Sequence, residues 1–283
     1  MMATRKPRST GGRERMFQPA LADLDVVILC GGLGTRLREE TEVKPKPMVE
    51  IGGRPIIWHI MKIYSRFGLR NFILCLGYKG EVLRDYFLNY RYNRSDLAVD
   101  LQSSSVEVLG NEPLEDWRVV LADTGDEAQT GARIRTAMKY IRHDRFFATY
   151  GDGVSDIAID ALYNCHVANG RHATVTAVHP TARFGEIAID GGKVTTFHEK
   201  PQITDGWVSG GFFVFERAAF DRASASSDLS LEHHVLPELA RKNQLGAYHH
   251  DGFWQCMDTY RDLLLLNNLC KDERAPWMIG DGW

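Results

Sequence analysis

A short apolar segment, residues 25–30, runs directly into the glycine-rich turn Gly31-Gly32-Leu33-Gly34-Thr35-Arg36. Glycines let main-chain N–H groups approach a polyanion closely, and Arg36 adds a positive charge at the end of the turn. The segment Lys44-Pro45-Lys46-Pro47 then supplies two lysines, and its prolines hold the chain extended so that a lysine can reach back over the turn. This combination predicts a site for a nucleoside triphosphate, although a plain strand-to-helix turn would use the same glycines.

Segments typical of strands alternate with segments typical of helices between residues 25 and 180. The expected strands are 25–30, 72–76, 118–122, 145–150 and 173–178, and the expected helices are 55–67, 80–91, 130–141 and 157–169. Asp156 is expected at the N-cap or in the first turn of the last helix. The alternation predicts an α/β fold with a Rossmann-like, mixed but mostly parallel sheet flanked by helices, and ligands beyond the carboxyl ends of the strands.

The pattern changes after Pro180. Residues 186–198 read as a hairpin with a glycine turn, residues 208–215 as a strand, and residues 231–243 and 259–270 as helices. We therefore interpret residues 25–283 as one domain, with a main part at 25–180 and a smaller β-rich part at 181–283. Residues 1–24 are rich in arginine and are expected to be a disordered leader, with an organelle transit peptide as the alternative.

Composition excludes several classes of protein. The net charge of −3 argues against a general nucleic-acid binder, and no apolar run approaches the length of a membrane span. The five cysteines are widely spaced and lack a C-x-x-C pair, which predicts reduced thiols and a cytoplasmic location. The glycine turn matches neither G-x-G-x-x-G nor G-x-x-x-x-G-K-[ST], which argues against a dinucleotide oxidoreductase and a P-loop NTPase.

Two acids are candidate metal ligands. Asp152, in Tyr150-Gly151-Asp152-Gly153, directly follows an expected strand, where a carboxylate suits Mg²⁺ together with phosphate oxygens. A simple Asp-Gly turn would explain the same residues. Asp258 precedes the expected last helix, so it also reads as an N-cap of that helix. Together, two acids at loop ends that face a triphosphate site predict a magnesium site.

A further set of residues is suited to a sugar phosphate. Glu199 and Lys200 follow an expected strand and offer a carboxylate and an ammonium group, although an exposed ion-paired turn is the alternative. The pair Gly210-Gly211 would allow a ligand to approach the strand closely, or it would mark a β-bulge.

These motifs together resemble the sugar-1-phosphate nucleotidylyltransferase family, whose hallmark is G-G-x-G-T-R-L followed by a Lys-Pro lysine. The resemblance runs from about Val26 to Trp277. The elements Glu39-Glu40-Thr41 and Gly252-Phe253-Trp254-Gln255 resemble the branch that uses CTP. Ala132 stands where that family is expected to have glycine.

The resemblance implies transfer of CMP from CTP to α-D-glucose 1-phosphate, which gives CDP-glucose and pyrophosphate by Mg²⁺-assisted in-line attack. The same chemistry with UTP, dTTP or another sugar 1-phosphate is the alternative, and a silent regulatory subunit is a second one. The implied catalytic residues are Arg36, Lys46 and Asp152, and the implied metal ligands are Asp152 and Asp258. The implied nucleotide-binding residues are Leu29, Gly31, Gly32, Leu33, Gly34, Thr35, Arg36, Lys46, Thr130, Gly131, Arg133 and Gly151. The implied sugar-binding residues are Gly185, Glu199, Lys200 and Gly211.

The resemblance also implies a nucleotide-binding part at 25–180 and a sugar-binding and assembly part at 181–283. The expected partners are CTP, glucose 1-phosphate and further copies of the chain, up to a hexamer, with neither nucleic acid nor membrane. Mg²⁺ is the expected cofactor.

Overall fold

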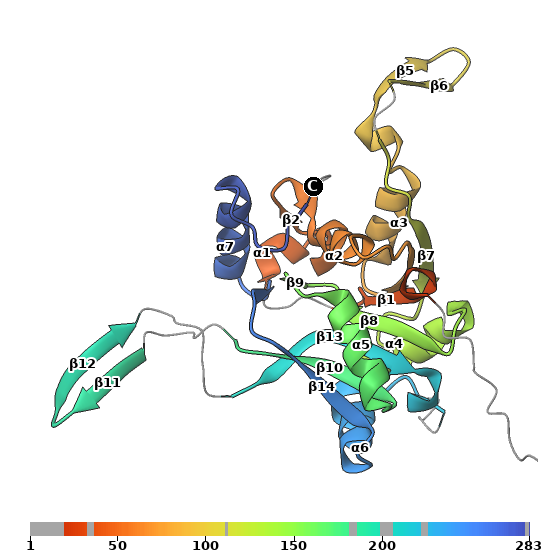
Figure 1. Ribbon diagram of the computed structural model, residues 1–283. Helices are drawn as coiled ribbons and strands as arrows, with labels where there is room; N and C mark the ends of the chain where they lie inside the picture. The colour runs from red at the N-terminus through yellow and green to blue at the C-terminus, as the bar shows by residue number, and fades with distance from the viewer. Residues whose placement is uncertain are drawn as a thin grey trace, which may run out of the picture.

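A seven-stranded sheet lies at the centre of the computed structural model, which describes residues 20–32, 37–110, 113–180, 186–198, 206–221, 226–280 and 283. Its order is β14-β10-β13-β8-β1-β4-β7 (Figure 1). The strands are β1 (Asp25–Leu29), β4 (Asn71–Leu76), β7 (Arg118–Asp123), β8 (Arg145–Tyr150), β10 (Ala173–Val178), β13 (Val208–Glu216) and β14 (Leu245–His250). Neighbours are parallel except at β13, which is antiparallel to both β8 and β10. The predicted mixed, mostly parallel sheet is confirmed.

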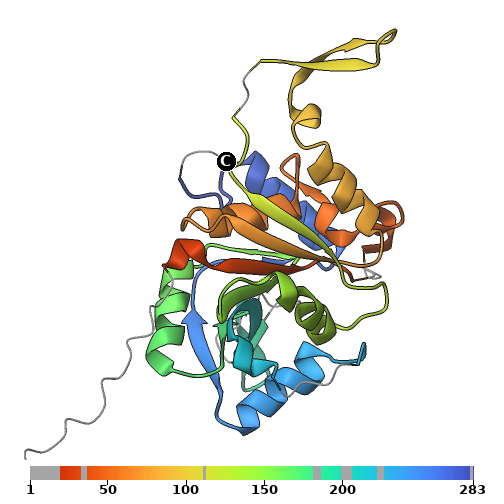
Figure 2. The same ribbon diagram turned by 90° about the vertical axis from the view of Figure 1, so that its right-hand side faces the viewer.

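Helices cover both faces of this sheet (Figures 1 and 2). They are α1 (Arg38–Thr41), α2 (Ile56–Ser65), α3 (Gly80–Leu88), α4 (Thr130–Ala137), α5 (Ile159–Asn169), α6 (Leu236–Arg241) and α7 (Tyr260–Lys271). The helix expected at 130–141 continues after α4 as a 3-10 turn, Met138–Tyr140. The helix expected at 231–243 begins as a π-helical turn, η7 (Leu231–Val235), before α6.

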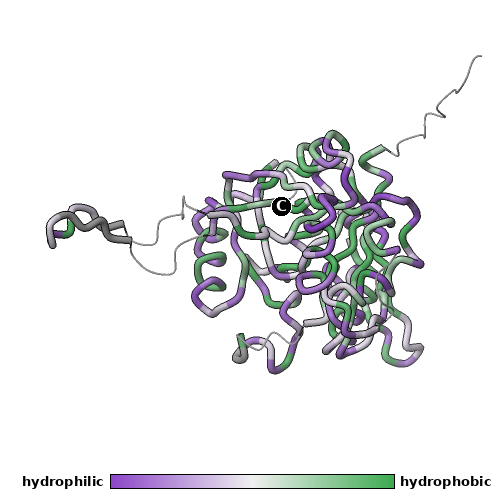
Figure 3. The backbone as a smooth tube through the Cα atoms, turned by 90° about the horizontal axis from the view of Figure 1, so that it is seen from below, coloured by the Kyte–Doolittle hydropathy of each residue, from purple (hydrophilic) through white to green (hydrophobic). Residues whose placement is uncertain are grey.

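The core explains why the central strands are continuous apolar runs. In β1, Val26 and Ile28 pack into one hydrophobic cluster, whereas Val27 and Leu29 pack into a second cluster on the other face. Both faces of the strand are therefore buried, as is typical of parallel sheets covered by helices. Figure 3 shows the hydrophobic stretches of the chain, in green, running through the body of the molecule.

Both predicted helix caps are wrong. Asp156 does not cap α5, whose N-cap is Ala158, and its carboxylate lies 2.9 Å from His250 Nε2 instead. Asp258 does not cap α7 either, because Thr259 is the N-cap and forms a capping box with Asp262. The carboxylate of Asp258 contacts Lys46 instead.

Several short paired strands lie outside the main sheet. The predicted hairpin is present as β11 (Glu186–Asp190) and β12 (Lys193–His198). A second hairpin, β5 (Asp96–Asp100) and β6 (Ser105–Leu109), was not predicted, and it extends away from the body in Figure 1. Two smaller ladders join β2 (Glu50–Ile51) to β3 (Arg54–Pro55) and β9 (Gly153–Ser155) to β15 (Trp254–Cys256).

The N-terminal boundary differs from the expectation. Most of the predicted leader, residues 1–19, lies outside the described residues. However, Leu21–Asp23 form a 3-10 turn and Leu24 is fully buried, so the folded chain begins before the predicted boundary at residue 25. None of the helices in the described ranges is long and apolar enough to span a membrane.

Candidate functional site

A cleft of about 790 Å³ lies at the carboxyl ends of β1 and β8. This is the edge at which open α/β sheets bind ligands. Its lining includes Leu29, Cys30, Gly31, Gly32, Lys46, Pro47, Asp126, Glu127, Ala128, Gln129, Thr130, Arg133, Tyr150, Gly151, Asp152 and Asp258. A cavity of about 850 Å³ between Ala218 and Lys242 is lined by none of the predicted site residues. The first cleft is therefore the candidate site.

A lysine and two aspartates meet in this cleft. The ammonium nitrogen of Lys46 lies 2.7 Å from Asp152 Oδ2 and 2.5 Å from Asp258 Oδ1. Their side chains are 13%, 26% and 36% exposed, so all three remain reachable from solvent. Lys44, in contrast, pairs with Glu40 at 3.8 Å and is not among the cleft residues. The structure thus distinguishes the two lysines of the Lys-Pro-Lys-Pro segment.

Backbone pairing brings the two aspartates together. Asp152 lies in the turn between β8 and β9, and Asp258 follows β15. In the β9–β15 ladder Gly153 pairs with Cys256, and the N–H of Met257 donates to the carbonyl oxygen of Asp152 at 2.8 Å. The acids, far apart in sequence, are therefore held side by side by main-chain hydrogen bonds.

Gly151 is required by close packing at the start of this turn. Its N–H donates to the carbonyl oxygen of Leu29 at 3.0 Å. A Cβ atom at this position would lie only 2.8 Å from that oxygen and 3.0 Å from a side-chain carbon of Pro47. The glycine thus lets β8 end directly against β1 and the Lys46 segment.

Electrostatics favour a cation between the acids. Burial alone would lower the pKa of the Lys46 ammonium group, but the charge of Asp152 and hydrogen bonds to both aspartates hold that pKa above its usual value. The lysine is therefore fully charged when the cleft contains no other cation. It occupies the position that a metal ion bound by both carboxylates would take.

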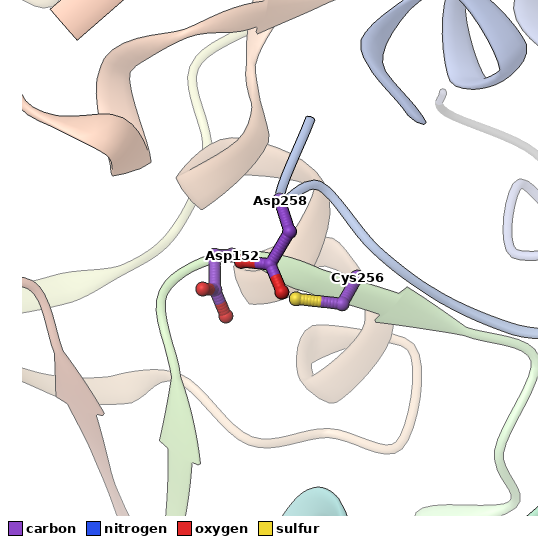
Figure 4. Close-up of side chains that lie close together, drawn as sticks. All are labelled: Asp152, Cys256 and Asp258. Atoms are coloured by element: carbon purple, nitrogen blue, oxygen red, sulfur yellow. The ribbon is translucent and has the colours of Figure 1, made fainter. Parts of the chain in front are cut away.

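The donor set of the acids fits a divalent metal. Oxygens of Asp152 and Asp258 converge with the sulfur of Cys256, all within 4.8 Å of one another (Figure 4). Carboxylates at this spacing can bind a small divalent cation that completes its shell with water and phosphate oxygens. The convergence of both acids on the Lys46 ammonium group supports the same conclusion, because a cation already lies between them there.

Arg133 has a bracing role that sequence motifs did not reveal. The residue is 4% exposed, and its guanidinium group donates to the carbonyl oxygens of Gly31, Leu76, Gly125 and Asp126 and to the hydroxyl of Thr124 at 2.7–3.0 Å. These acceptors lie in the loops after β1 and β7 and, for Leu76, at the last residue of β4. Arg133 therefore lines the cleft and at the same time connects the carboxyl ends of three neighbouring strands.

Glu232 is a cleft-side acid that the sequence analysis missed. Its carboxylate accepts hydrogen bonds from Thr130 at 2.6 Å, from Ser230 at 2.8 Å and from the hydroxyl of Tyr150. These hydrogen bonds outweigh the effect of burial and lower the pKa of Glu232, so the acid stays ionised. It fixes the orientation of two side chains that line the cleft, Thr130 and Tyr150.

Comparison with known proteins agrees with this geometry. A family described as "Nucleotidyl transferase" matches residues 25–273. The chain belongs to the nucleotidyl transferase family. It is 46% identical over 255 residues to the glucose-1-phosphate cytidylyltransferase of Salmonella typhi, covering 90% of this chain and 98% of that protein. It is 40% identical over 256 residues to the probable glucose-1-phosphate cytidylyltransferase of Bacillus subtilis (strain 168), covering 90% and 100%.

Two solved structures share the fold. A putative glucose-1-phosphate thymidylyltransferase from Bacillus anthracis superimposes with a TM-score of 0.64 at 17% identity, covering 92% of this chain and 97% of that one. The HddC protein of Yersinia pseudotuberculosis, in complex with GMP-PN, gives a TM-score of 0.63 at 23% identity, covering 87% and 98%. The resemblance predicted from the motifs is confirmed at the level of fold and family.

The predicted site residues of this nucleotidyl transferase fall into three groups. Those that the cleft brings together are Leu29, Gly31, Gly32, Lys46, Thr130, Arg133, Gly151, Asp152 and Asp258. Those that lie outside the described residues are Leu33, Gly34, Thr35, Arg36, Gly185, Glu199 and Lys200. Gly131 and Gly211 make close packing contacts instead, since a Cβ atom would lie 2.9 Å from a carbonyl oxygen of Leu229 and 2.5 Å from the ring of Tyr150, respectively. Gly211 also sits where the β10–β13 register shifts, as the bulge interpretation predicts.

Proposed function

We propose that this nucleotidyl transferase transfers CMP from CTP to α-D-glucose 1-phosphate, giving CDP-glucose and pyrophosphate. Relatives at 46% and 40% identity, matched over nearly their whole length, carry this activity in their names. The structural observation that carries the proposal is that Lys46 lies between Asp152 and Asp258 at the carboxyl ends of the parallel strands. A site with two acids and a fixed cation is suited to joining two phosphorylated substrates.

The chemistry needs no covalent enzyme intermediate. An oxygen of the sugar phosphate attacks the α-phosphorus of CTP, a P–O bond forms, the bond to the β-phosphate breaks, and pyrophosphate leaves. The attacking group is already an anion, so the protein's task is to orient two polyanions and offset their charge. When bound by Asp152 and Asp258, Mg²⁺ would act as a Lewis acid on the phosphates. Lys46 would offset charge at the α-phosphate, and Arg36 is proposed to lie near the leaving pyrophosphate.

The remaining assignments are proposals of the same kind. The nucleotide would lie along residues 29–36 and Thr130–Arg133, with Gly131 shaping the helix start. The sugar phosphate would contact Gly185, Glu199, Lys200 and Gly211 in the part at 181–283. We also propose a homo-oligomer of up to six chains. The five free cysteines are consistent with the reducing environment of a cytoplasmic enzyme.

A panel of triphosphates tests the proposal. The purified protein is assayed for pyrophosphate release with Mg²⁺, glucose 1-phosphate and CTP, UTP, dTTP or GTP in turn. We expect kcat/KM for CTP to exceed that for each of the others by at least about 100-fold, because a site that hydrogen-bonds the cytosine amine rejects bases without it. A higher value for UTP, dTTP or GTP would contradict the CTP assignment, and no release with any of them would indicate a silent subunit.

A second panel keeps CTP and varies the sugar. Galactose 1-phosphate and mannose 1-phosphate replace glucose 1-phosphate at equal concentration. We expect glucose 1-phosphate to give the highest kcat/KM. Faster turnover with another sugar 1-phosphate would leave the reaction class intact and change the substrate.

A further inference from the structure

The sulfur of Cys256 lies beside the two proposed metal ligands. One oxygen of Asp152, one oxygen of Asp258 and the sulfur are all within 4.8 Å of one another. Figure 4 shows the sulfur and the carboxylate of Asp258 pointing toward each other. Cys256 is half-buried and is not part of a disulfide. The proposed CMP transfer gives this thiol no role, since Mg²⁺ prefers oxygen ligands.

The position of the thiol is fixed by the same backbone pairing as the acids. Cys256 is the last residue of β15 and pairs with Gly153, the residue directly after Asp152. The following N–H, that of Met257, bonds to the carbonyl oxygen of Asp152. A donor set of two oxygens and one sulfur is therefore built into a hydrogen-bonded ladder.

Two carboxylates and one thiolate suit a different class of ion from Mg²⁺. Zn²⁺ and related cations bind sulfur at about 2.3 Å and carboxylate oxygen at about 2.0–2.2 Å, so the ligand atoms on one tetrahedral ion lie about 3.3–3.7 Å apart. The ligand atoms here, all within 4.8 Å of one another, would reach this geometry by side-chain rotations that draw them together by up to about 1 Å. A fourth position would remain for water or a phosphate oxygen.

We propose that Asp152, Cys256 and Asp258 bind a thiophilic divalent cation of the Zn²⁺ class, which excludes Mg²⁺ from the same carboxylates. The second half of this proposal rests on the proposed Mg²⁺ site. On binding, a sulfur–metal bond forms and the thiol proton passes to solvent buffer. The Lys46 ammonium group leaves the carboxylates at the same time, because one cation replaces another between them.

The thiol distinguishes this site from a pair of carboxylates alone. Magnesium gains nothing from this group, whereas a thiophilic cation forms a bond to it. Cys256 therefore makes the site bind thiophilic cations in preference to Mg²⁺.

Direct binding of Cd²⁺ to the substrate-free protein tests the metal site. Cd²⁺ is a thiophilic probe whose bond to a thiolate gives a charge-transfer band in the ultraviolet. In the wild-type protein we expect the band to reach full intensity with one equivalent of Cd²⁺. In Cys256→Ser we expect no band and a Cd²⁺ affinity that is weaker by at least about tenfold. Cys165→Ser is the matched control, because Cys165 is also half-buried but lies on α5, away from the acids. It should retain the full band.

Three results would overturn the proposal. They are a wild-type protein without the band, an unchanged band in Cys256→Ser, or loss of the band in Cys165→Ser. The last two would place the bound ion at another cysteine. Because no substrate is present, these outcomes do not depend on whether CTP is the nucleotide, so they are distinguishable from failure of the proposed function.

Inhibition gives a second readout. Pyrophosphate release is measured at fixed Mg²⁺ with increasing Zn²⁺, and each variant is compared with its own rate without Zn²⁺. We expect the Zn²⁺ concentration for half inhibition to rise at least about tenfold in Cys256→Ser and to stay unchanged in Cys165→Ser. Equal sensitivity of all three proteins would contradict competition at this site.

Discussion

Lys46 forms ion pairs with both Asp152 and Asp258 before any ligand binds. If the two acids also hold the catalytic metal, their amide variants should lose turnover far more than stability. We expect Asp152→Asn and Asp258→Asn each to lower kcat by about 10²–10³-fold, because the developing charge on the phosphates is no longer offset. Each amide keeps the size of the side chain, so the thermal midpoint should change little.

The matched control is Asp221→Asn, which alters an exposed aspartate outside the cleft. Its kcat and thermal midpoint should equal those of the wild-type protein. Normal turnover in either cleft variant would remove that aspartate from the metal site.

Single residues of the site differ in how well the sequence predicts them. Lys46, Asp152 and Asp258 are predictable because charged groups that follow apolar strands or stand between prolines are seldom needed for packing. Cys256 is not, since a lone cysteine in a strand-like segment reads as a small core residue. Its contact with the acids depends on the β9–β15 ladder, a pairing that joins segments far apart in sequence.

At the scale of the element, the turn after β1 depends on one buried guanidinium group. A Cβ atom on Gly31 would lie 2.2 Å from a guanidinium nitrogen of Arg133, whereas one on Gly32 would meet no atom within 4 Å. We expect Gly31→Ala to reduce the free energy of unfolding by about 1–3 kcal/mol, the usual cost of forcing atoms into a filled space. Urea unfolding measures this change.

Gly32→Ala is the control, because it makes the same chemical change in the neighbouring residue. It should cost less than about 1 kcal/mol. Equal destabilisation by both substitutions would show that backbone freedom, rather than the guanidinium group, accounts for Gly31.

Elements buried on both faces are the ones that the sequence predicts well. The strands β8 and β10 match their expected bounds, because a short apolar run bounded by turn residues is typical of a buried strand. The β5–β6 hairpin escapes prediction because its strands pair only with each other and remain exposed, with Val99 54% and Val106 48% accessible. Caps are also hard to assign, since Asp258 and Thr259 are adjacent and both are good N-cap residues.

At the scale of the whole molecule, His59 joins segments from opposite ends of the chain. On α2, its Nε2 lies 2.8 Å from the carbonyl oxygen of Ile51, so this nitrogen donates. The indole N–H of Trp277 donates to Nδ1 at 3.2 Å, which requires a neutral ring. Burial lowers the pKa of His59 from 6.5 to about 4, and the charge of Arg54 contributes to the same shift.

This histidine should make the fold sensitive to acid. The folded pKa lies below the unfolded one, so the unfolded chain binds more protons between pH 6.5 and pH 4. The stability that the neutral His59 ring contributes is fully present above pH 6.5 and is lost as the pH falls toward 4. We expect His59 to account for a loss of about 2 kcal/mol in the free energy of unfolding between pH 7 and pH 5.

Urea unfolding at both pH values measures this loss. His59→Gln should be less stable than the wild-type protein at pH 7. It should not show the loss in the free energy of unfolding that His59 causes between pH 7 and pH 5. His233→Gln, which changes an exposed histidine, should keep it. An identical pH dependence in wild-type protein and His59→Gln would contradict the assignment.

The ion pairs of Lys46 have a consequence for the order of events in a catalytic cycle. With no ligand present, one ammonium group is paired with two carboxylates, so Lys46, Asp152 and Asp258 together carry a net charge of −1. A dication that takes the place of the ammonium group neutralises the two carboxylates completely and frees the lysine together with its charge. The side chain can then turn to a phosphate only after the metal has arrived.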